Sequence, residues 1–399
     1  MIMAKKVRLK PTKEQEKQLW KTAGTARFVY NWALDKQIQH MKTTGKLNKI
    51  NDGELRKEIS RLKQTDEYRW LNEVSNNAAK QAVKDVCLAL DRFHSERKKH
   101  GYKYRQSAMK SGKKLSFTDF EDFPRFKSKK RSKVSFYHDT DKLKVYSHEV
   151  KLEKTGKVKL AEEDRITTNT KYTNPRITHD GKYWYISVGI EVDSPDIDLT
   201  GEVVGIDVGI KDLAVCSNDM KFKNINKKKK TKKQTKKLRR LQRMVSRKYQ
   251  KNKKGGKFVK TSNIVKLEKK IKLVNRKIAN IRQNHIHHAT AAIVKTKPSR
   301  VVMESLNIRG MMKNRHLCKA IGEQGMHNFK TIMRYKCEYY GIEFVEADKW
   351  YPSSRKCVVC GNIKKDLKLS DRTYRCPECG NVIDRDYQAA LNLSNYEAT

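Results

Sequence analysis

The sequence predicts a multidomain α+β fold that combines an α/β core, a zinc-ribbon insertion, a β-barrel domain and an inserted helical lobe. Three observations support this prediction. The 399 residues are enough for two or three domains that each bury a core. Six short β-like runs lie between residues 134 and 192, whereas helical periodicity dominates before residue 100 and after residue 230. Two Cys-x-x-Cys pairs then follow at metal-site spacing.

The N-terminal region predicts one strand followed by helices. Residues 4–10 alternate in polarity and stop at a proline, which suits a short strand. From Thr12, the residues Thr-Lys-Glu-Gln resemble a capping box, which predicts the start of a long helix. Further helices are expected over 52–63 and 72–98. We therefore assign residues 12–115 to a helical lobe.

The middle region predicts a small β-barrel. Turn signals separate its short β-like runs, and His179-Asp180-Gly181-Lys182 suits a hairpin turn. The strand at 4–10 has no partner in the helical lobe, so we expect it to close this barrel. Residues 1–11 and 116–200 would then form one domain, into which the lobe is inserted.

From residue 203 the pattern changes to buried strands that alternate with helices. VVGIDVGIKDLAVCS predicts two β-branched strands joined by a tight turn, and RVVMESL, which starts at residue 300, predicts a third. A helix over 326–340 and a strand over 341–348 continue this α/β pattern. We expect an α/β core at 201–350, a zinc ribbon at 351–382 and a C-terminal helix of the core at 383–399.

The charge balance indicates a nucleic-acid partner. The chain has 91 Lys and Arg against 44 Asp and Glu, which gives a net charge of +47. Such a charge favours a polyanion, because each basic side chain that meets a phosphate releases condensed counterions. No apolar run is long enough to span a bilayer and no apolar leader segment follows the first residues, so we expect no membrane contact. We expect a cytoplasmic protein, associated with the nucleoid if the source is prokaryotic.

More than half of the excess charge lies in residues 221–284, which hold 27 basic residues and one acid, Glu268. Apolar residues at 3-4 spacing on both sides of Gly255-Gly256 predict an antiparallel pair of long helices with one buried seam. A run of charge is ordinarily a solvated face, but here the basic side chains would repel one another without counter-charges. We expect nucleic acid along this hairpin, with Arg239, Arg240, Arg243, Arg247 and Lys248 as candidate contacts.

The strongest local signal is the cysteine quartet. Cys357, Cys360, Cys376 and Cys379 follow the pattern C-x2-C-x15-C-x2-C, with a glycine directly after each pair. This spacing lets four thiolates surround a Zn²⁺ ion tetrahedrally. Because protein sulfur fills every position, the predicted zinc is structural. The remaining cysteines are scattered in apolar contexts and are expected to be core thiols in a reducing compartment.

Three acidic positions are candidates for a catalytic site. Asp207 and Glu304 lie near the ends of predicted buried strands, where lone carboxylates are expensive to bury. Asp386, at the start of the last helix, would complete the set, although Asp384 competes for this place and such acids are more often caps or turn residues. Crowded carboxylates need hard cations, and two Mg²⁺ or Mn²⁺ ions can promote phosphodiester hydrolysis.

These motifs together resemble the TnpB family of transposon-encoded proteins, which are related to the compact type V CRISPR nucleases. RLKPTKEQ and ARFVYNWAL resemble the start of the family sequence, and FPRFKSKKRS resembles its middle section. GIDVGIKDLAV, MESLNIRGMMKN and DRDYQAALN resemble its three acidic motifs, and YPSSRKCVVCG with CPECG resembles its zinc ribbon. The likeness extends over essentially the whole chain.

The resemblance implies a RuvC (RNase H-like) nuclease core with Asp207, Glu304 and Asp386 as catalytic acids, and it favours Asp386 over Asp384. The barrel would be a wedge domain and the lobe a recognition lobe. The implied activity is cleavage of double-stranded DNA beside a short transposon-adjacent motif, directed by a transposon-derived guide RNA. Gln388 departs from the asparagine that is usual in the family, but it does not replace an acid, so we expect activity to be retained.

Recognition of the adjacent motif has a weaker signal. Asn76, Asn77 and Lys80 at the start of the third helix offer base-edge or phosphate contacts, although an ordinary polar helix face fits equally well.

Two alternative functions stay open at this point, a catalytically silent RNA-guided repressor and a DNA transposase. The intact acidic set argues against the first. Against the second, the sequence shows no evident His-x-His motif with a downstream nucleophilic tyrosine, because His285-Ile286-His287 lies in a helical basic stretch.

Overall fold

A computed structural model of the protein describes residues 1–44, 49–99, 122–129, 132–368 and 371–397. The chain divides into two compact units, residues 2–192 and residues 193–399 with Met1. Each unit is described separately below. The expected boundary between the helical lobe and the barrel, at residues 115 and 116, lies outside the described residues.

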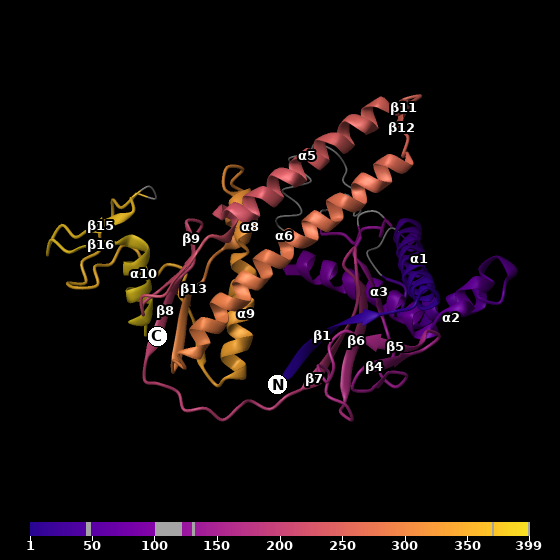
Figure 1. The fold of residues 1–399 in the computed structure, drawn as a ribbon, viewed down its shortest axis with the longest axis horizontal. Helices are drawn as coiled ribbons and strands as arrows, with labels where there is room; N and C mark the ends of the chain where they lie inside the picture. Colours follow the sequence, from indigo (N-terminus) through magenta and orange to yellow (C-terminus); the bar gives the residue numbers. More distant parts are fainter. Residues whose placement is uncertain (45–48, 100–121, 130–131, 369–370, 398–399) are drawn as a thin grey trace. The chain divides into compact units, whose positions relative to one another are not determined.

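The first unit contains a seven-stranded antiparallel sheet in the order β2-β6-β7-β1-β5-β4-β3 (Figure 1). The N-terminal strand β1 lies inside this sheet, as expected, because it pairs with β7 from Ile2↔Glu191 to Leu9↔Trp184 and then with β5. Among the described residues no pairing joins the edge strands β2 and β3, so closure into a barrel stays a prediction. The strands are β1 (Ile2–Lys10), β2 (Val134–Tyr137), β3 (Lys144–Val145), β4 (Glu149–Leu152), β5 (Gly156–Leu160), β6 (Tyr172–His179) and β7 (Trp184–Glu191).

Helices of the first unit share one hydrophobic core with this sheet. The predicted capping box is confirmed, because the Thr12 amide donates to Gln15 Oε1 at 3.0 Å and the Gln15 amide donates to Thr12 Oγ1 at 3.3 Å. One helix start was predicted wrongly, at residue 72, because Val74 is extended and separates a 3-10 helix from α3. The helices are α1 (Lys13–Thr44), α2 (Asp52–Leu62), η1 (Asp66–Glu73) and α3 (Asn76–Lys99).

The second unit is built on a five-stranded sheet in the order β10-β9-β8-β13-β14. Strands β8, β13 and β14 run parallel, whereas β9 and β10 form an antiparallel extension beside β8. The short strand β10 was not predicted, because its three residues, Lys-Phe-Lys, give too short a signal. The strands are β8 (Val203–Asp207), β9 (Asp212–Cys216), β10 (Lys221–Lys223), β13 (Arg300–Glu304) and β14 (Glu343–Ala347).

Helices cover both faces of this sheet. Ile206 and Met303 point to one face, where they pack against α6 (Ser262–Lys295) and α9 (Met326–Tyr339). Val302 points to the opposite face and packs with Leu393 of α10 (Arg385–Ser394). The sheet is therefore the middle layer of an α/β arrangement, as the alternating pattern of strands and helices predicted.

The predicted basic hairpin is also present. Helix α5 (Lys229–Lys251) lies alongside the first half of α6, and the short strands β11 (Lys253–Lys254) and β12 (Lys257–Phe258) connect them (Figure 1). Gly255 and Gly256 have positive φ angles of 51° and 79°, which explains glycine at both turn positions. The buried seam consists of Leu241, Leu267, Val274 and Ile278, with Leu238, Val245 and Ile271 packed against it.

The cysteine-rich segment forms a small separate cluster around Tyr374, which is fully buried. Strands β15 (Thr373–Arg375) and β16 (Val382–Asp384) form its hairpin. None of the described helices has the combination of length and apolar residues that crossing a membrane requires.

Candidate active site

Two of the predicted acids lie side by side at the ends of parallel strands. Asp207 is the last residue of β8, and Glu304 is the last residue of β13. The register pairs Ile206 with Met303, so each acid is the next residue along its strand. Because side chains alternate across a sheet, both acids point to the same face as Val302, which is the face covered by α10.

Gly205 allows α10 to approach this face closely. A Cβ atom at residue 205 would lie 2.0 Å from the Ala390 carbonyl oxygen and 2.4 Å from the Ser394 amide nitrogen. Any larger residue would therefore push the helix away from β8. The close approach lets the first turn of α10, which carries Asp386, lie near the end of the strand that carries Asp207.

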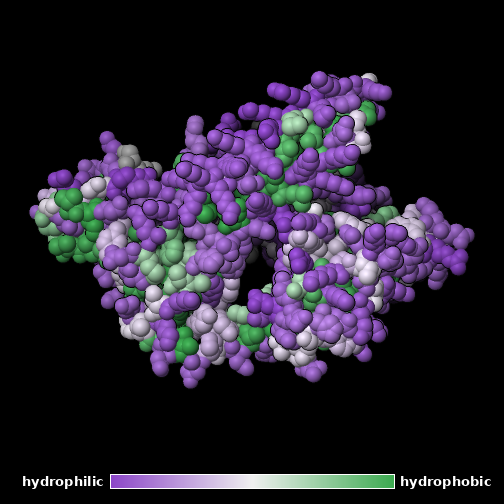
Figure 2. Space-filling model, viewed as in Figure 1, coloured by the Kyte–Doolittle hydropathy of each residue, from purple (hydrophilic) through white to green (hydrophobic). Residues whose placement is uncertain are grey.

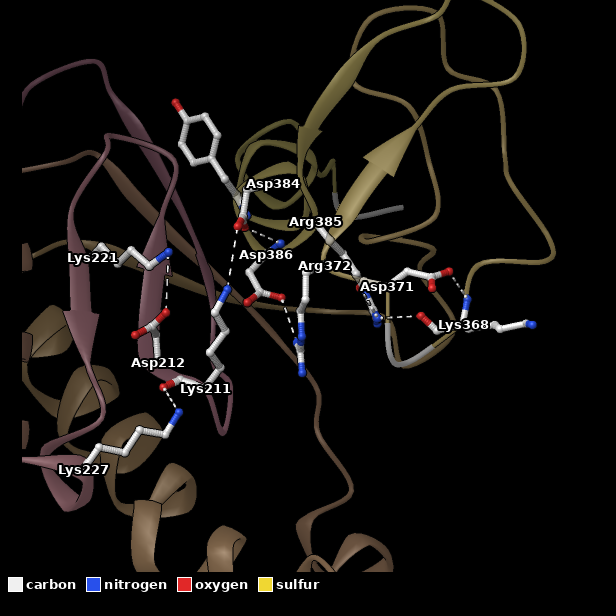
Figure 3. Close-up of polar contacts among 11 residues, drawn as sticks. Lys211, Asp212, Lys221, Lys227, Lys368, Asp371, Arg372, Asp384, Arg385 and Asp386 are labelled. Atoms are coloured by element: carbon white, nitrogen blue, oxygen red, sulfur yellow. Dashed lines mark hydrogen bonds and ion pairs between the residues drawn. The ribbon is translucent and has the colours of Figure 1, made fainter. Parts of the chain in front are cut away.

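Asp384 and Asp386 have different structural roles. Asp384 is the N-cap of α10, because its Oδ1 accepts hydrogen bonds from the amides of Asp386 at 3.0 Å and Tyr387 at 3.2 Å. Figure 3 shows Lys211 reaching towards Asp384 and Arg372 towards Asp386, with ion-pair distances of 4.0 and 3.9 Å. The side chain of Asp386 is 17% exposed, against 39% for Asp384.

The electrostatics of Asp207 show that the three acids interact. Asp207 keeps some exposed surface, but protein atoms surround it densely, and this burial raises the pKa of its carboxyl well above the ordinary range. The negative charges of Glu304 and then Asp386 raise this pKa further, and Asp384 has a smaller effect. Carboxylates that repel one another in this way suit hard divalent cations, which would neutralise the repulsion.

The structure adds two supporting residues that the sequence interpretation missed. Ser353 is buried, and its hydroxyl donates a hydrogen bond to Glu304 Oε1. Asn392, on the buried side of α10, donates from Nδ2 to the carbonyl oxygens of Ser353 and Lys356, at 2.6 Å each. A polar residue at the inward position next to Leu393 was the available signal for Asn392, because a buried amide needs partners.

The four predicted zinc ligands lie together. The Sγ atoms of Cys357, Cys360, Cys376 and Cys379 all lie within 4.8 Å of one another, and the pairs Cys357–Cys379 and Cys360–Cys376 are 3.6 and 3.5 Å apart. A tetrahedron with metal–sulfur bonds of about 2.3 Å has edges of about 3.8 Å, so the cluster can hold a zinc ion. It is the only group of three or more ligand-type side chains this close together in the described parts of the chain.

Two matching backbone turns build this cluster. The Cys357 amide donates to the Asn362 carbonyl oxygen and the Cys376 amide donates to the Asn381 carbonyl oxygen, at 2.8 Å each. Gly361 and Gly380 have positive φ angles of 76° and 71°, which accounts for the glycine that follows each pair.

The predicted nucleic-acid contacts lie at the surface of the two units. Arg239, Arg240, Arg243 and Arg247 are exposed and Lys248 is half-buried, and Figure 2 shows hydrophilic residues over most of the hairpin. The one acid of this segment, Glu268, is already paired with Lys260 at 2.5 Å. Asn76 and Lys80 are exposed at the start of α3, and Asn77 is half-buried.

Three family models match the chain. A helix-turn-helix domain of the OrfB/IS605 type matches residues 1–46, a probable transposase of the same type matches 185–315, and a Cas12f1-like TNB domain matches 327–393. Within the first range, the described residues form one strand and one long helix.

Relatives resemble the chain over nearly its whole length. A "Putative RNA-guided DNA endonuclease" of Streptomyces pristinaespiralis is 29% identical over 97% of this chain and 87% of its own length. The "Putative RNA-guided DNA endonuclease InsQ" of Escherichia coli is 27% identical over 98% of this chain and 91% of its own length. The fold is similar to that of Cas12f1 in its complex with sgRNA and target DNA, with a TM-score of 0.53 and 14% identity, covering 96% of this chain and 83% of that chain. The resemblance to the TnpB family is thereby confirmed.

The zinc assignment predicts that Cys376→Ser removes bound metal. We expect the zinc content to fall from about one ion per chain to near zero, because serine replaces one of four thiolate ligands. Cys318→Ser is the matched control, because Cys318 lies outside the cluster and is only half-buried. The measurement is elemental analysis of the purified proteins together with thermal unfolding. Unchanged zinc content in Cys376→Ser would show that the ribbon assignment is wrong.

Proposed function

We propose that this TnpB-like chain is an RNA-guided endonuclease that cleaves double-stranded DNA next to a short transposon-adjacent motif. The relatives that match it over nearly its full length are named RNA-guided DNA endonucleases, and the net charge of +47 suits nucleic-acid partners. The observation that carries the proposal is the convergence of Asp207, Glu304 and Asp386 on one face of the core sheet.

Each of these acids has a specific part in the proposed site. Asp207 and Glu304 are fixed by the strand register, and Asp386 is added by α10, so together they would hold two Mg²⁺ or Mn²⁺ ions. When bound, such ions activate a water nucleophile and stabilise the leaving oxygen of a phosphodiester. Asp384 caps the helix and thereby fixes the position of Asp386. In this proposal the second unit's sheet is the RuvC (RNase H-like) core.

The remaining parts are assigned by the same proposal. Residues 1–11 and 116–200 form the wedge domain, and residues 12–115 form the recognition lobe, where Asn76, Asn77 and Lys80 contact the DNA motif. The basic hairpin binds phosphates of the transposon-derived guide RNA or the DNA, because its exposed arginines lie on α5, a helix that contains no acidic residue. The zinc ribbon supports the start of α10, where Asp386 lies, through the hydrogen bond from Arg385 to the Lys368 carbonyl oxygen.

The acid assignment predicts loss of cutting with retained binding. Asp207→Ala, Glu304→Ala and Asp386→Asn should each slow cleavage by at least about 100-fold, because losing a metal ligand removes several kcal/mol of transition-state stabilisation. The measurement is cleavage of matched duplex DNA by protein with its co-purified RNA in Mg²⁺ or Mn²⁺, alongside RNA and DNA binding.

The matched control for this set is Asp384→Asn. Asparagine caps a helix as well as aspartate does, so this variant loses a charge but keeps the N-cap and should keep most of its activity. Cleavage that survives both Asp207→Ala and Glu304→Ala would disprove the two-metal site. Full RNA-guided binding by a wild-type protein that never cuts would instead favour the silent repressor.

The hydrogen bond from Ser353 to Glu304 predicts a change in metal dependence. Ser353→Ala should raise the Mg²⁺ concentration for half-maximal cutting by about 10-fold, because groups that orient metal ligands affect metal affinity by 10- to 100-fold. Ser354→Ala is the control, because the neighbouring Ser354 accepts a hydrogen bond from Gln388 through its carbonyl oxygen, which alanine keeps. Equal Mg²⁺ titration curves for the two variants would contradict this role of Ser353.

The charge argument predicts strong salt dependence. Replacing Arg239, Arg240, Arg243 and Arg247 together by glutamine should reduce the slope of log K against log salt by about 3 to 4, because each phosphate contact contributes about 0.7 to 0.9. The measurement is binding of the co-purified RNA and of target DNA between low and moderate salt. An unchanged slope for both ligands would exclude these side chains as phosphate contacts.

A further inference from the structure

Trp350 is unusually exposed for a tryptophan. Its surface is 81% accessible, more than for any other large apolar side chain of the described residues. An indole ring left in water forgoes a large favourable burial, so such a ring on a folded surface commonly marks a binding site.

The backbone beneath this ring is firmly held. The Trp350 amide donates to Asp348 Oδ1 at 2.7 Å, and the Tyr351 amide donates to the Asp348 carbonyl oxygen at 3.1 Å. The Tyr351 hydroxyl donates to the Asn392 carbonyl oxygen at 2.9 Å, which ties the turn to α10. The exposed ring is therefore presented by an ordered turn, and little entropy would be lost on binding.

The residues on either side of Trp350, Lys349 and Tyr351, line a pocket that Glu304 also lines. This pocket has a volume of about 170 Å³. Asp348 belongs to the same lining. Lys349 Nζ lies 4.6 Å from the centre of the Trp350 ring, so a positive charge accompanies the aromatic surface.

We propose that Trp350 stacks on an unpaired nucleobase of the DNA strand that enters the acid site, with Lys349 facing the strand's phosphates. Aromatic rings bind single-stranded nucleic acid in this way because every base has a flat π face. A protein partner is less well matched, because the residues just before the ring, Asp348 and Lys349, are both charged. This inference rests on the proposed function, which supplies the DNA strand at Glu304.

The test uses RNA-loaded protein with Asp207→Ala, so that DNA binds without being cut. Target duplexes carry the fluorescent base 2-aminopurine at successive positions around the cleavage sites of either strand. We expect emission at one or two positions to be quenched, to recover in Trp350→Ala, and to stay quenched in Trp350→Phe. Val359→Ala is the matched control, because Val359 is 69% exposed on the zinc ribbon that follows Trp350 but is aliphatic.

Cleavage by proteins with intact Asp207 gives the second measurement. Trp350→Ala should reduce kcat/KM by about tenfold, since stacking on one base contributes about 1–3 kcal/mol, and Trp350→Phe should restore most of it. If wild type cuts but Trp350→Ala cuts equally well with unchanged fluorescence, the inference fails and the proposed function stands. A change in oligomeric state in Trp350→Ala without a fluorescence change would overturn it in favour of protein docking. If the wild-type protein does not cut, the proposed function and the inference that rests on it both fail.

Discussion

The close contact between α10 and strand β8 at Gly205 is the constraint on which the candidate site depends. The helix backbone lies where a Cβ of residue 205 would be, so only glycine accommodates it. Asp207 is the next residue on the same face, and the helix that touches Gly205 begins with the turn that carries Asp386. One missing side chain therefore allows acids 179 residues apart in the sequence to share a site.

The same helix connects the zinc ribbon to the acid site. The side-chain amide of Asn392 donates to the carbonyl oxygens of Ser353 and Lys356, the two ends of the segment that leads into Cys357. The Ser353 hydroxyl donates to Glu304. At its other end, Arg385 Nη1 donates to the Lys368 carbonyl oxygen of the ribbon at 3.1 Å (Figure 3). A metal-bound ribbon would thus fix the loop that orients one acid and the helix that carries another.

One helix, α6, belongs both to the basic hairpin and to the α/β core. Helix α6 is continuous over 34 residues. Its first half packs against α5 through Leu267, Val274 and Ile278, whereas its second half packs on the sheet through Ile286 and Ile293. Arg282, between the two halves, donates to Asn226 Oδ1 at 2.7 Å. The densest positive charge of the chain is therefore carried on a helical extension that is continuous with the core.

The sequence by itself determined the elements whose signals are local: the capping box at Thr12, the hairpin seam, the strands ending in Asp207 and Glu304, and the cysteine spacing. It left Asp384 and Asp386 as alternatives, because both are acids at one helix start. The family resemblance favoured Asp386, and the tertiary structure gives the two acids different contacts: Asp384 accepts hydrogen bonds from the helix amides, while the charge of Asp386 acts more strongly on Asp207. Ser353, Asn392 and Trp350 likewise gained meaning only from partners distant in the sequence, which no periodicity can reveal.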